Sequence, residues 1–244
     1  MADLKRTNVL GVGFDDMTME EAVSAAVEKL SRDGAEYVVT PNPEIVQMCR
    51  ADRELLSAVN GASLVLADGI GVVYGAKILG RPLKGRVPGI DFIQAVFEKI
   101  KDTDKTVFLL GSKPGVAEAA GENLERRYPG LKIVGTADGY FRNDDEPVRK
   151  INAVSPDLLL VCLGCPKQEY FMKNNAERLN VRLMAGLGGS LDVFAGTVER
   201  APEIYQKLGL EWFYRLIKEP KRIKRMIKLP GFIFASAGQR IKGK

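Results

Sequence analysis

The feature that most limits how this 244-residue chain can fold is a regular alternation of short apolar runs and helical segments. The apolar runs are nearly continuous and rich in Val, Ile and Leu, as is typical of strands buried on both faces of a sheet. Between them lie segments long enough for the helical crossovers that parallel strands need. The alternation therefore predicts an α/β fold, with a Rossmann-like, mostly parallel sheet and helices on both faces.

The expected elements follow from the apolar runs, the turn residues and the helix-capping signals. Thr18 and Glu21 have the spacing of a capping box, which starts the first helix. Strands are expected at residues 7–13, 36–40, 63–67, 106–111, 132–140, 157–164 and 181–189. Helices are expected at residues 18–30, 43–60, 70–79, 89–101, 116–128, 144–154 and 167–178. We expect residues 1–195 to form the α/β domain and residues 196–244 to form a C-terminal appendage.

The chain contains no histidine, and this absence removes several kinds of active site. It excludes Ser-His-Asp triads, Cys-His pairs and zincin-type sites. Any catalysis must rest on carboxylates, backbone amides, Arg and Lys, or on neutral polar side chains. Three cysteines cannot all pair, which favours a reducing, cytoplasmic setting. Neither a signal peptide nor a membrane-spanning helix is expected.

The net charge of +5 is unevenly distributed. Residues 218–244 hold nine basic residues and one acidic residue, which leaves −3 for residues 1–217. Projected on a helix, residues 212–228 separate into an apolar and a basic face, with Pro220 dividing the stretch in two. This basic amphipathic appendage favours contact with an anionic membrane surface. Packing of the apolar stripe on the body and binding of nucleic acid are the alternatives.

Polar residues and glycines follow six of the expected strands, in segments 40–44, 68–71, 111–113, 138–140, 164–169 and 186–192. The carboxyl ends of parallel strands meet at one edge of a sheet and form its ligand crevice. Glycines there, such as Gly188, expose backbone N–H groups that can bind phosphate. A single glycine more often makes only a tight turn, but six such ends together favour a nucleotide-like ligand.

Standard motifs are not met. The chain lacks the dinucleotide fingerprint and the Walker A ending. Asp102 and Asp104 have the Asp-x-Asp spacing of many metal-dependent glycosyltransferases, but neighbouring lysines favour a solvated turn. Cys162 and Cys165 have redox spacing but straddle a strand end, and Cys49 is expected to pack on its helix. We expect no metal and no cofactor.

Two charged residues near the expected crevice could carry chemistry. Asp68 follows an apolar run and precedes Gly-Ile-Gly, so it could be a partly desolvated general base or an ordinary turn residue. Arg86, in a Gly-Arg-Val-Pro-Gly loop, could bind a diphosphate through its forked guanidinium or form a surface ion pair. Position alone does not decide the role of Asp68, and for Arg86 it favours the surface ion pair.

Seven ordered segments together resemble the WecG/TagA/CpsF glycosyltransferase family, over about residues 8–229. They are 40–44 (TPNPE), 68–71 (DGIG), 86–89 (RVPG), 164–169 (GCPKQE), 188–196, 200–202 (RAP) and 208–220. The resemblance implies inverting, metal-independent transfer of N-acetylmannosamine or a related hexose from a UDP-sugar. The implied acceptor is undecaprenyl-diphosphate-linked N-acetylglucosamine, and the product would feed wall teichoic acid or surface polysaccharide synthesis.

The resemblance also implies roles for individual residues. Asp68 corresponds to the candidate base, and Tyr140 and Asp192 are weaker candidates for holding the uridine. Further substrate-binding residues would be Thr40, Asn42, Arg86, Gln168 and Gly188, with Arg215 and Arg222 of the appendage contacting a diphosphate. Cys165 departs from the small residue, such as Ala, that is more usual there, which could alter packing beneath Gln168.

The family's C-terminal segment implies an enzyme peripheral to the inner face of the cell membrane, with an appendage that closes over the site. Two other hypotheses remain at this point: a nucleotide-dependent oxidoreductase on a Rossmann-like sheet, and a noncatalytic basic-tail membrane-binding module. The donor epimer and assembly into a homo-oligomer stay open.

Overall fold

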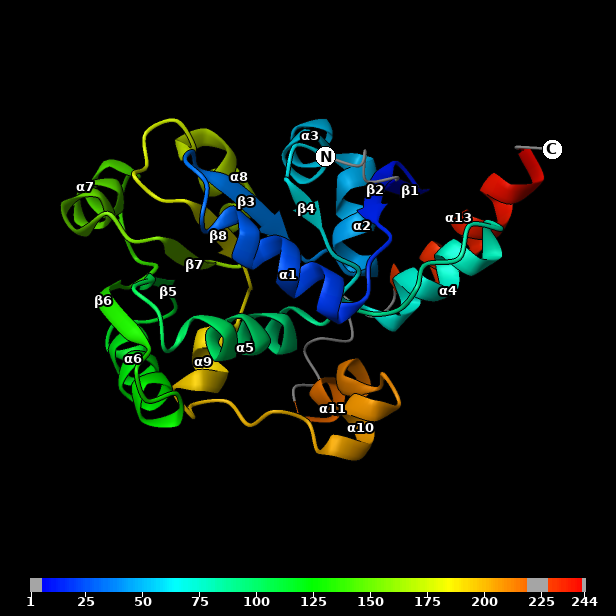
Figure 1. The fold of residues 1–244 in the computed structure, drawn as a ribbon. Coiled ribbons are helices and arrows are strands. Elements are labelled where there is room, and N and C mark those ends of the chain that lie inside the picture. Colours follow the sequence, from blue (N-terminus) through cyan, green and yellow to red (C-terminus); the bar gives the residue numbers. More distant parts are fainter. Residues whose placement is uncertain (1–5, 219–227, 243–244) are drawn as a thin grey trace.

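The computed structural model describes residues 6–218 and 228–242 and contains a six-stranded sheet with the order β4-β3-β8-β7-β5-β6. All neighbouring strands are parallel, which confirms the predicted α/β class (Figure 1). The strands are β3 (Glu36–Val39), β4 (Leu64–Val65), β5 (Thr106–Gly111), β6 (Lys132–Ala137), β7 (Leu158–Cys162) and β8 (Leu183–Gly186).

Helices cover both faces of this sheet, as predicted (Figure 1). One face packs on α1 (Met19–Lys29), α5 (Gly89–Ile100), α6 (Val116–Arg127) and α9 (Ser190–Phe194). The other packs on α2 (Pro43–Ala51), α3 (Arg53–Asn60), α4 (Ile70–Ile78), α7 (Asp145–Val154) and α8 (Lys167–Asn175). Successive strand residues enter opposite cores, as with Val38 and Val39, because side chains alternate along a strand. Both faces of the sheet are therefore shielded from water, which explains why the apolar runs in the sequence are nearly continuous.

The prediction of one strand at residues 7–13 is wrong. The segment is an antiparallel hairpin of β1 (Arg6–Val9) and β2 (Val12–Asp15), outside the six-stranded sheet. Leu10 and Gly11 form its turn with φ of 54° and 97°. Two positive φ values in succession match the twist of a two-residue hairpin turn, so the chain reverses in the middle of an apolar run.

The prediction of one helix at residues 43–60 is also wrong, because the helix breaks at Asp52. This residue has extended backbone angles, and its Oδ1 accepts hydrogen bonds from the N–H groups of Glu54 and Leu55, both at 3.0 Å. Asp52 thus ends α2 and caps α3. The capping box of α1 is confirmed, with Thr18 and Glu21 bonded in both directions.

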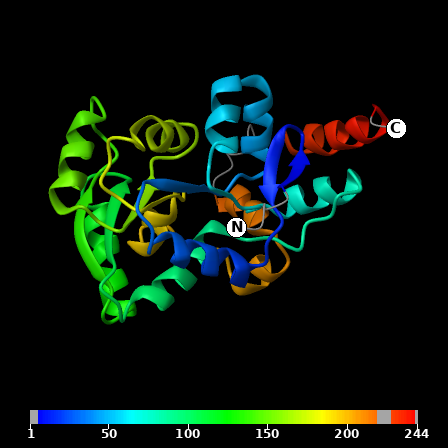
Figure 2. The same cartoon turned by 45° about the horizontal axis from the view of Figure 1, so that its top comes forward.

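The C-terminal part contains α10 (Glu203–Lys207), α11 (Glu211–Lys218) and α13 (Lys228–Lys242). Figure 2 shows α13 beside α4, and Phe232 is fully buried there. A Cβ on Gly75 would lie 2.6 Å from the Phe232 ring, so this glycine makes room for it. Part of the appendage therefore packs on the body. None of the helices within residues 6–218 and 228–242 is long and apolar enough to span a bilayer.

Candidate active site

The predicted pocket residue Thr40 lies where β3 and β8 end. Its Oγ1 donates a hydrogen bond of 3.1 Å to the carbonyl of Gly186, and the residue is buried. A Cβ on Gly89 would lie 3.1 Å from the Thr40 side chain and 3.2 Å from that of Leu187. The N-terminus of α5 therefore sits directly against these two strand ends, with its N–H groups at the crevice.

Asp68 lies beside the turn that contains Asn42. Its N–H is bonded to the carbonyl of Pro41 at 3.4 Å. A Cβ on the next residue, Gly69, would lie 2.7 Å from Pro43 and 3.4 Å from Asn42. Asn42 itself caps α2, its Oδ1 accepting from Ile45 N at 3.0 Å. The glycine thus allows the half-buried Asp68 and the start of α4 to approach Asn42 closely.

Gln168 and Gly188 meet above the end of β8. Gln168 is only 3% exposed. Its Oε1 accepts from Gly188 N at 2.9 Å, while its Nε2 donates to Glu169 Oε1 at 2.9 Å. Gly188 has a φ of +55°. The first turn of α8 and the β8–α9 loop are therefore tied together next to Thr40, whose partner Gly186 ends β8.

Arg86 lies in the loop that follows α4, next to the end of β4, where Val87 N donates to Ala67 O at 2.8 Å. Its side chain is 14% exposed, and its guanidinium pairs with Glu211 of α11 at 2.5 Å. Arg200 lies 3.4 Å from the same carboxylate and also pairs with Asp91 of α5 at 2.6 Å. An ion pair was one of the two expectations for Arg86. The pair is half-buried rather than at the surface, and it joins the appendage to the crevice.

Asp192 lies at the point where the strand order reverses. The connections after β5 and β7 leave in opposite directions, which makes this the expected ligand crevice of an open α/β sheet. Ser112, directly after β5, donates from Oγ to Asp192 Oδ2 at 2.7 Å. Its φ of +59° is unusual for a residue with a side chain. The structure thus brings the Asp192 carboxylate to the reversal point, where it accepts a hydrogen bond from Ser112, a residue with an unusual backbone conformation.

Tyr140 is near this crevice but open to solvent, with 71% of its surface exposed. The preceding Gly139 donates to Ser112 O at 2.8 Å and accepts from Lys167 Nζ at 2.8 Å. Tyr140 N is bonded to Asp138 Oδ1 at 2.7 Å. The β6 end is therefore fixed beside Ser112, while the Tyr140 ring itself packs little.

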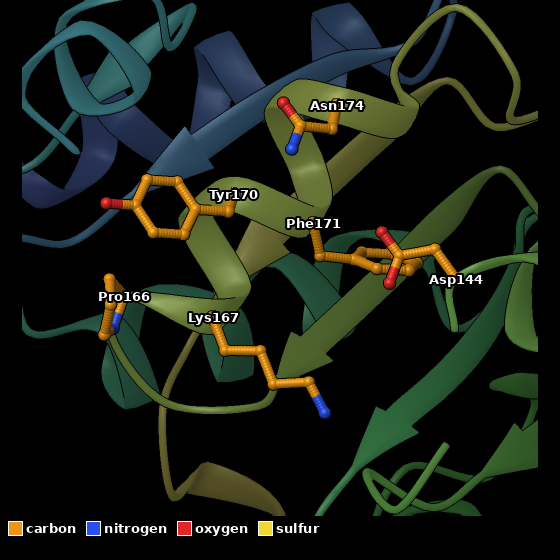
Figure 3. Close-up of a pocket in the computed structure, with 6 residues that line it drawn as sticks. All are labelled: Asp144, Pro166, Lys167, Tyr170, Phe171 and Asn174. Atoms are coloured by element: carbon orange, nitrogen blue, oxygen red, sulfur yellow. The ribbon is translucent and has the colours of Figure 1, made fainter. Parts of the chain in front are cut away.

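A pocket of about 280 Å³ lies on the flank of α8 (Figure 3). It is lined by Asp144, Pro166, Lys167, Tyr170, Phe171 and Asn174. Tyr170 Oη donates to Asp52 Oδ2 at 2.5 Å, and this hydrogen bond raises the pKa of the phenol to about 12. The Lys167 ammonium lies 3.9 Å from the Phe141 ring centroid. This pocket adjoins the crevice through Lys167, but its lining includes none of the described predicted site residues.

The three cysteines are free. Burial raises the pKa of the Cys49 and Cys162 thiols to about 12, and it raises that of Cys165 as well. A protonated thiol is a poor nucleophile and metal ligand. Cys49 packs in α2 as predicted. The Asp102–Asp104 segment is a turn, where Asp104 pairs with Lys132 at 3.2 Å.

The two arginines expected in the appendage are placed differently. Arg215 belongs to α11, the helix that Glu211 holds against Arg86. Arg222 lies outside the described residues. Three residues that sequence reasoning missed, Ser112, Glu169 and Glu211, all sit in the segments singled out above. Their partners are far away in the chain or depend on burial, so no local signal marked them.

Comparison with known proteins identifies the family of the chain. Residues 7–244 match the sequence profile described as "Glycosyl transferase WecG/TagA/CpsF family". A Bacillus spizizenii N-acetylglucosaminyldiphosphoundecaprenol N-acetyl-beta-D-mannosaminyltransferase is 36% identical over 206 residues, 84% of this chain and 80% of its own length. The enzyme of the same name from Staphylococcus aureus (strain MRSA252) is 37% identical over 242 residues, 97% of this chain and 95% of its own length. The chain therefore belongs to the WecG/TagA/CpsF family of glycosyltransferases.

Proposed function

We propose that this enzyme transfers N-acetylmannosamine, or a closely related hexose, from a UDP-sugar to undecaprenyl-diphosphate-linked N-acetylglucosamine. The reaction inverts the anomeric centre and needs no metal ion. The acceptor and the transferred sugar are those named for the relatives at 36% and 37% identity. The product feeds synthesis of wall teichoic acid or a surface polysaccharide.

The observation that carries the chemistry is the placement of Asp68. Close packing of Gly69 on Asn42 and Pro43 supports this role, because it brings Asp68 next to the turn after β3, at the same edge of the sheet as Thr40 and Gln168. Asp68 takes the proton of the acceptor hydroxyl as its oxygen bonds to the anomeric carbon. The bond from that carbon to UDP breaks at the same time, and its electron pair leaves on the diphosphate. Attack opposite the leaving group produces the inversion.

The leaving diphosphate carries negative charge, which arginines and helix N-termini can stabilise. Arg86 is the candidate in the body, and Arg215 and Arg222 are the candidates in the appendage. In the structure Arg86 faces Glu211. The diphosphate would therefore share Arg86 with this carboxylate or displace it. The helices α4 and α5 both begin at the crevice. Asp192, held by Ser112, and Tyr140 are candidates for contacts with the uridine.

Residues 1–195 would carry the chemistry and residues 196–244 would bind the inner face of the cell membrane. Large apolar side chains on the described part of the appendage support this role. They are exposed at Ile204, Leu208, Trp212, Phe213, Ile217 and Phe234. Five of them lie in the segment of α10 and α11, and an exposed apolar cluster of this kind often marks an interaction site. Here the partner would be the anionic lipid surface that also holds the acceptor.

UDP release across a panel of UDP-hexoses, with one polyprenyl-diphosphate N-acetylglucosamine acceptor, tests the proposed reaction. We expect release that requires the acceptor, is fastest with UDP-N-acetylmannosamine and is unchanged by EDTA. No acceptor-dependent release with any donor would contradict the transfer. Loss of activity in EDTA, restored by a divalent cation, would contradict the metal-independent mechanism.

A further inference from the structure

Glu169 is a buried carboxyl group that the proposed mechanism does not use. It lies in the first turn of α8 and is 1% exposed. Its Oε1 accepts the hydrogen bond from Gln168 Nε2. Its Oε2 is buried and has no hydrogen-bond partner within residues 6–218 and 228–242. Burying an ionised carboxylate with an unpaired oxygen would cost much free energy. A neutral acid carries no net charge and avoids most of this cost.

In the part of the chain that the structure describes, no positive charge is among the groups that act on Glu169. The thiols of Cys165 and of Cys49 in α2 lie close enough to interact with its carboxyl group. The other titratable groups that act on these thiols are the carboxyl groups of Glu44 and Asp52. Burial raises the pKa of Glu169 from its usual value, against the effect of its hydrogen bonds.

The partner of Glu169 links it to the crevice. Gln168 donates to Glu169 through Nε2 and accepts from Gly188 N through Oε1. If the amide were turned over, its oxygen would face Glu169 Oε1 and its NH₂ group would face the Gly188 N–H. The first contact would then join two oxygen atoms, and the second would join two N–H donors. Glu169 and Gly188 thus select one orientation of the amide.

The space around this amide is tight, so it cannot adjust freely. A Cβ on Gly186 would lie 3.1 Å from Gln168 Nε2 and 2.7 Å from Met172. Gly186 also accepts the hydrogen bond from Thr40. A shift of the Gln168 amide would therefore disturb the positions of both the β8–α9 loop and Thr40.

We infer that Glu169, as a neutral acid, is a positioning residue that acts through Gln168 to hold the β8–α9 loop in its substrate-binding arrangement. The inference rests on the proposed function for the role of Gln168. Ionisation of Glu169 would bring an unpaired charge beneath the amide and loosen the loop. Catalysis would then weaken as pH rises through the folded-state pKa of Glu169, for a reason separate from the base Asp68.

Two substitutions test this role. Glu169→Gln keeps an acceptor for Gln168 Nε2 but cannot ionise, and Glu169→Ala removes the acceptor. We expect kcat/KM to fall about tenfold or more in Glu169→Ala, since small misplacements near a reacting centre are costly. Glu169→Gln should recover most of that loss at pH 7. Its activity should also persist as pH rises through the folded-state pKa of Glu169, where that of the wild type declines.

Thermal unfolding against pH gives a readout that needs no substrate. Because the folded-state pKa of Glu169 is raised, its contribution to stability is complete below the unfolded pKa and is lost as pH rises through the folded pKa. The Tm of the wild type should therefore fall relative to that of Glu169→Gln across this interval. Glu177→Gln, at an exposed glutamate after the same helix, is the matched control. Its Tm and its activity should follow those of the wild type at every pH.

The outcomes separate this inference from the proposed reaction. A Tm difference between the wild type and Glu169→Gln that is constant with pH would overturn the neutral-acid assignment. Folded Glu169→Gln with activity as low as that of Glu169→Ala would overturn the positioning role. If no donor is turned over but the Tm difference still varies with pH, the proposed reaction fails while the neutral state of Glu169 stands.

Discussion

At the scale of single residues, the crevice depends on side chains that hold one another rather than on isolated reactive groups. Asp68 is placed by the contact of Gly69 with Pro43, Gln168 by Glu169 and Gly188, and Asp192 by Ser112. Each of these supports is a short hydrogen bond or a close packing contact. Their removal should therefore affect substrate binding and turnover more than the fold.

Ser112 offers a direct test at this scale. Ser112→Ala and Ser112→Gly both remove the hydrogen bond to Asp192, which is worth about 0.5–1.5 kcal/mol. We expect UDP affinity, measured by isothermal titration calorimetry, to fall about two- to tenfold in both variants. The two should differ in stability, because glycine adopts the φ of +59° without strain and alanine does not.

Thermal unfolding completes the Ser112 test, with the glycine variant expected to have the higher Tm of the two. Unchanged UDP affinity in both variants would remove Asp192 from the uridine site. Equal Tm values would show that the backbone at Ser112 is not strained.

At the scale of elements, the described C-terminal helices pack on the body, and we propose that their exposed faces also bind the membrane. α13 is anchored to the body by Phe232 in the space that Gly75 leaves open. α11 is anchored by the chain of ion pairs from Arg86 through Glu211 and Arg200 to Asp91. Deleting the whole tail would therefore disturb the body as well as any membrane contact. Substitutions on the exposed faces of these helices are the cleaner test.

We expect the double variant Ile217→Gln and Phe234→Gln to bind anionic vesicles about tenfold more weakly than the wild type. Ile217 is 56% exposed and Phe234 is 76% exposed, and neither is part of the buried core. Loss of about 1.4 kcal/mol of apolar burial in the lipid would produce this change. Cosedimentation with phosphatidylglycerol vesicles measures it.

The matched control for the vesicle experiment is Val154→Gln. Val154 has a comparable exposure of 41% but ends α7, on the opposite side of the molecule from α13 (Figure 1). The control should bind vesicles like the wild type. Equal binding by the double variant and the wild type would contradict the membrane role of the appendage.

At the scale of the whole molecule, the sequence predicted the parallel sheet and the helices on both its faces well. Buried parallel strands leave a strong apolar signal, and the carboxyl ends of such strands must share one edge. The reversal at Leu10 and Gly11 was missed because the apolar pattern continues through the hairpin. The helix break at Asp52 had a local signal, an Asp capping residue, but the surrounding helical pattern obscured it.

The contacts within the candidate site were less predictable. Arg86 and Glu211 are 125 residues apart, and nothing in either local segment indicates that they meet. Ser112 and Asp192 are 80 residues apart. The buried state of Glu169 arises from α2, α8 and the loop before α8 together. Such features depend on tertiary packing, which a local pattern does not contain.

The central claim is that Asp68 is the base for transfer to the acceptor, and a single-turnover experiment tests it most directly. Asp68→Asn keeps the shape of the side chain but removes its ability to take a proton. With enzyme and UDP-sugar premixed and then quenched at intervals after acceptor is added, we expect disaccharide-lipid formation to slow at least about 100-fold. The Kd for the UDP-sugar should change little. Asp104→Asn, in an exposed turn, should match the wild type. Formation of product by Asp68→Asn at the wild-type rate would contradict the account.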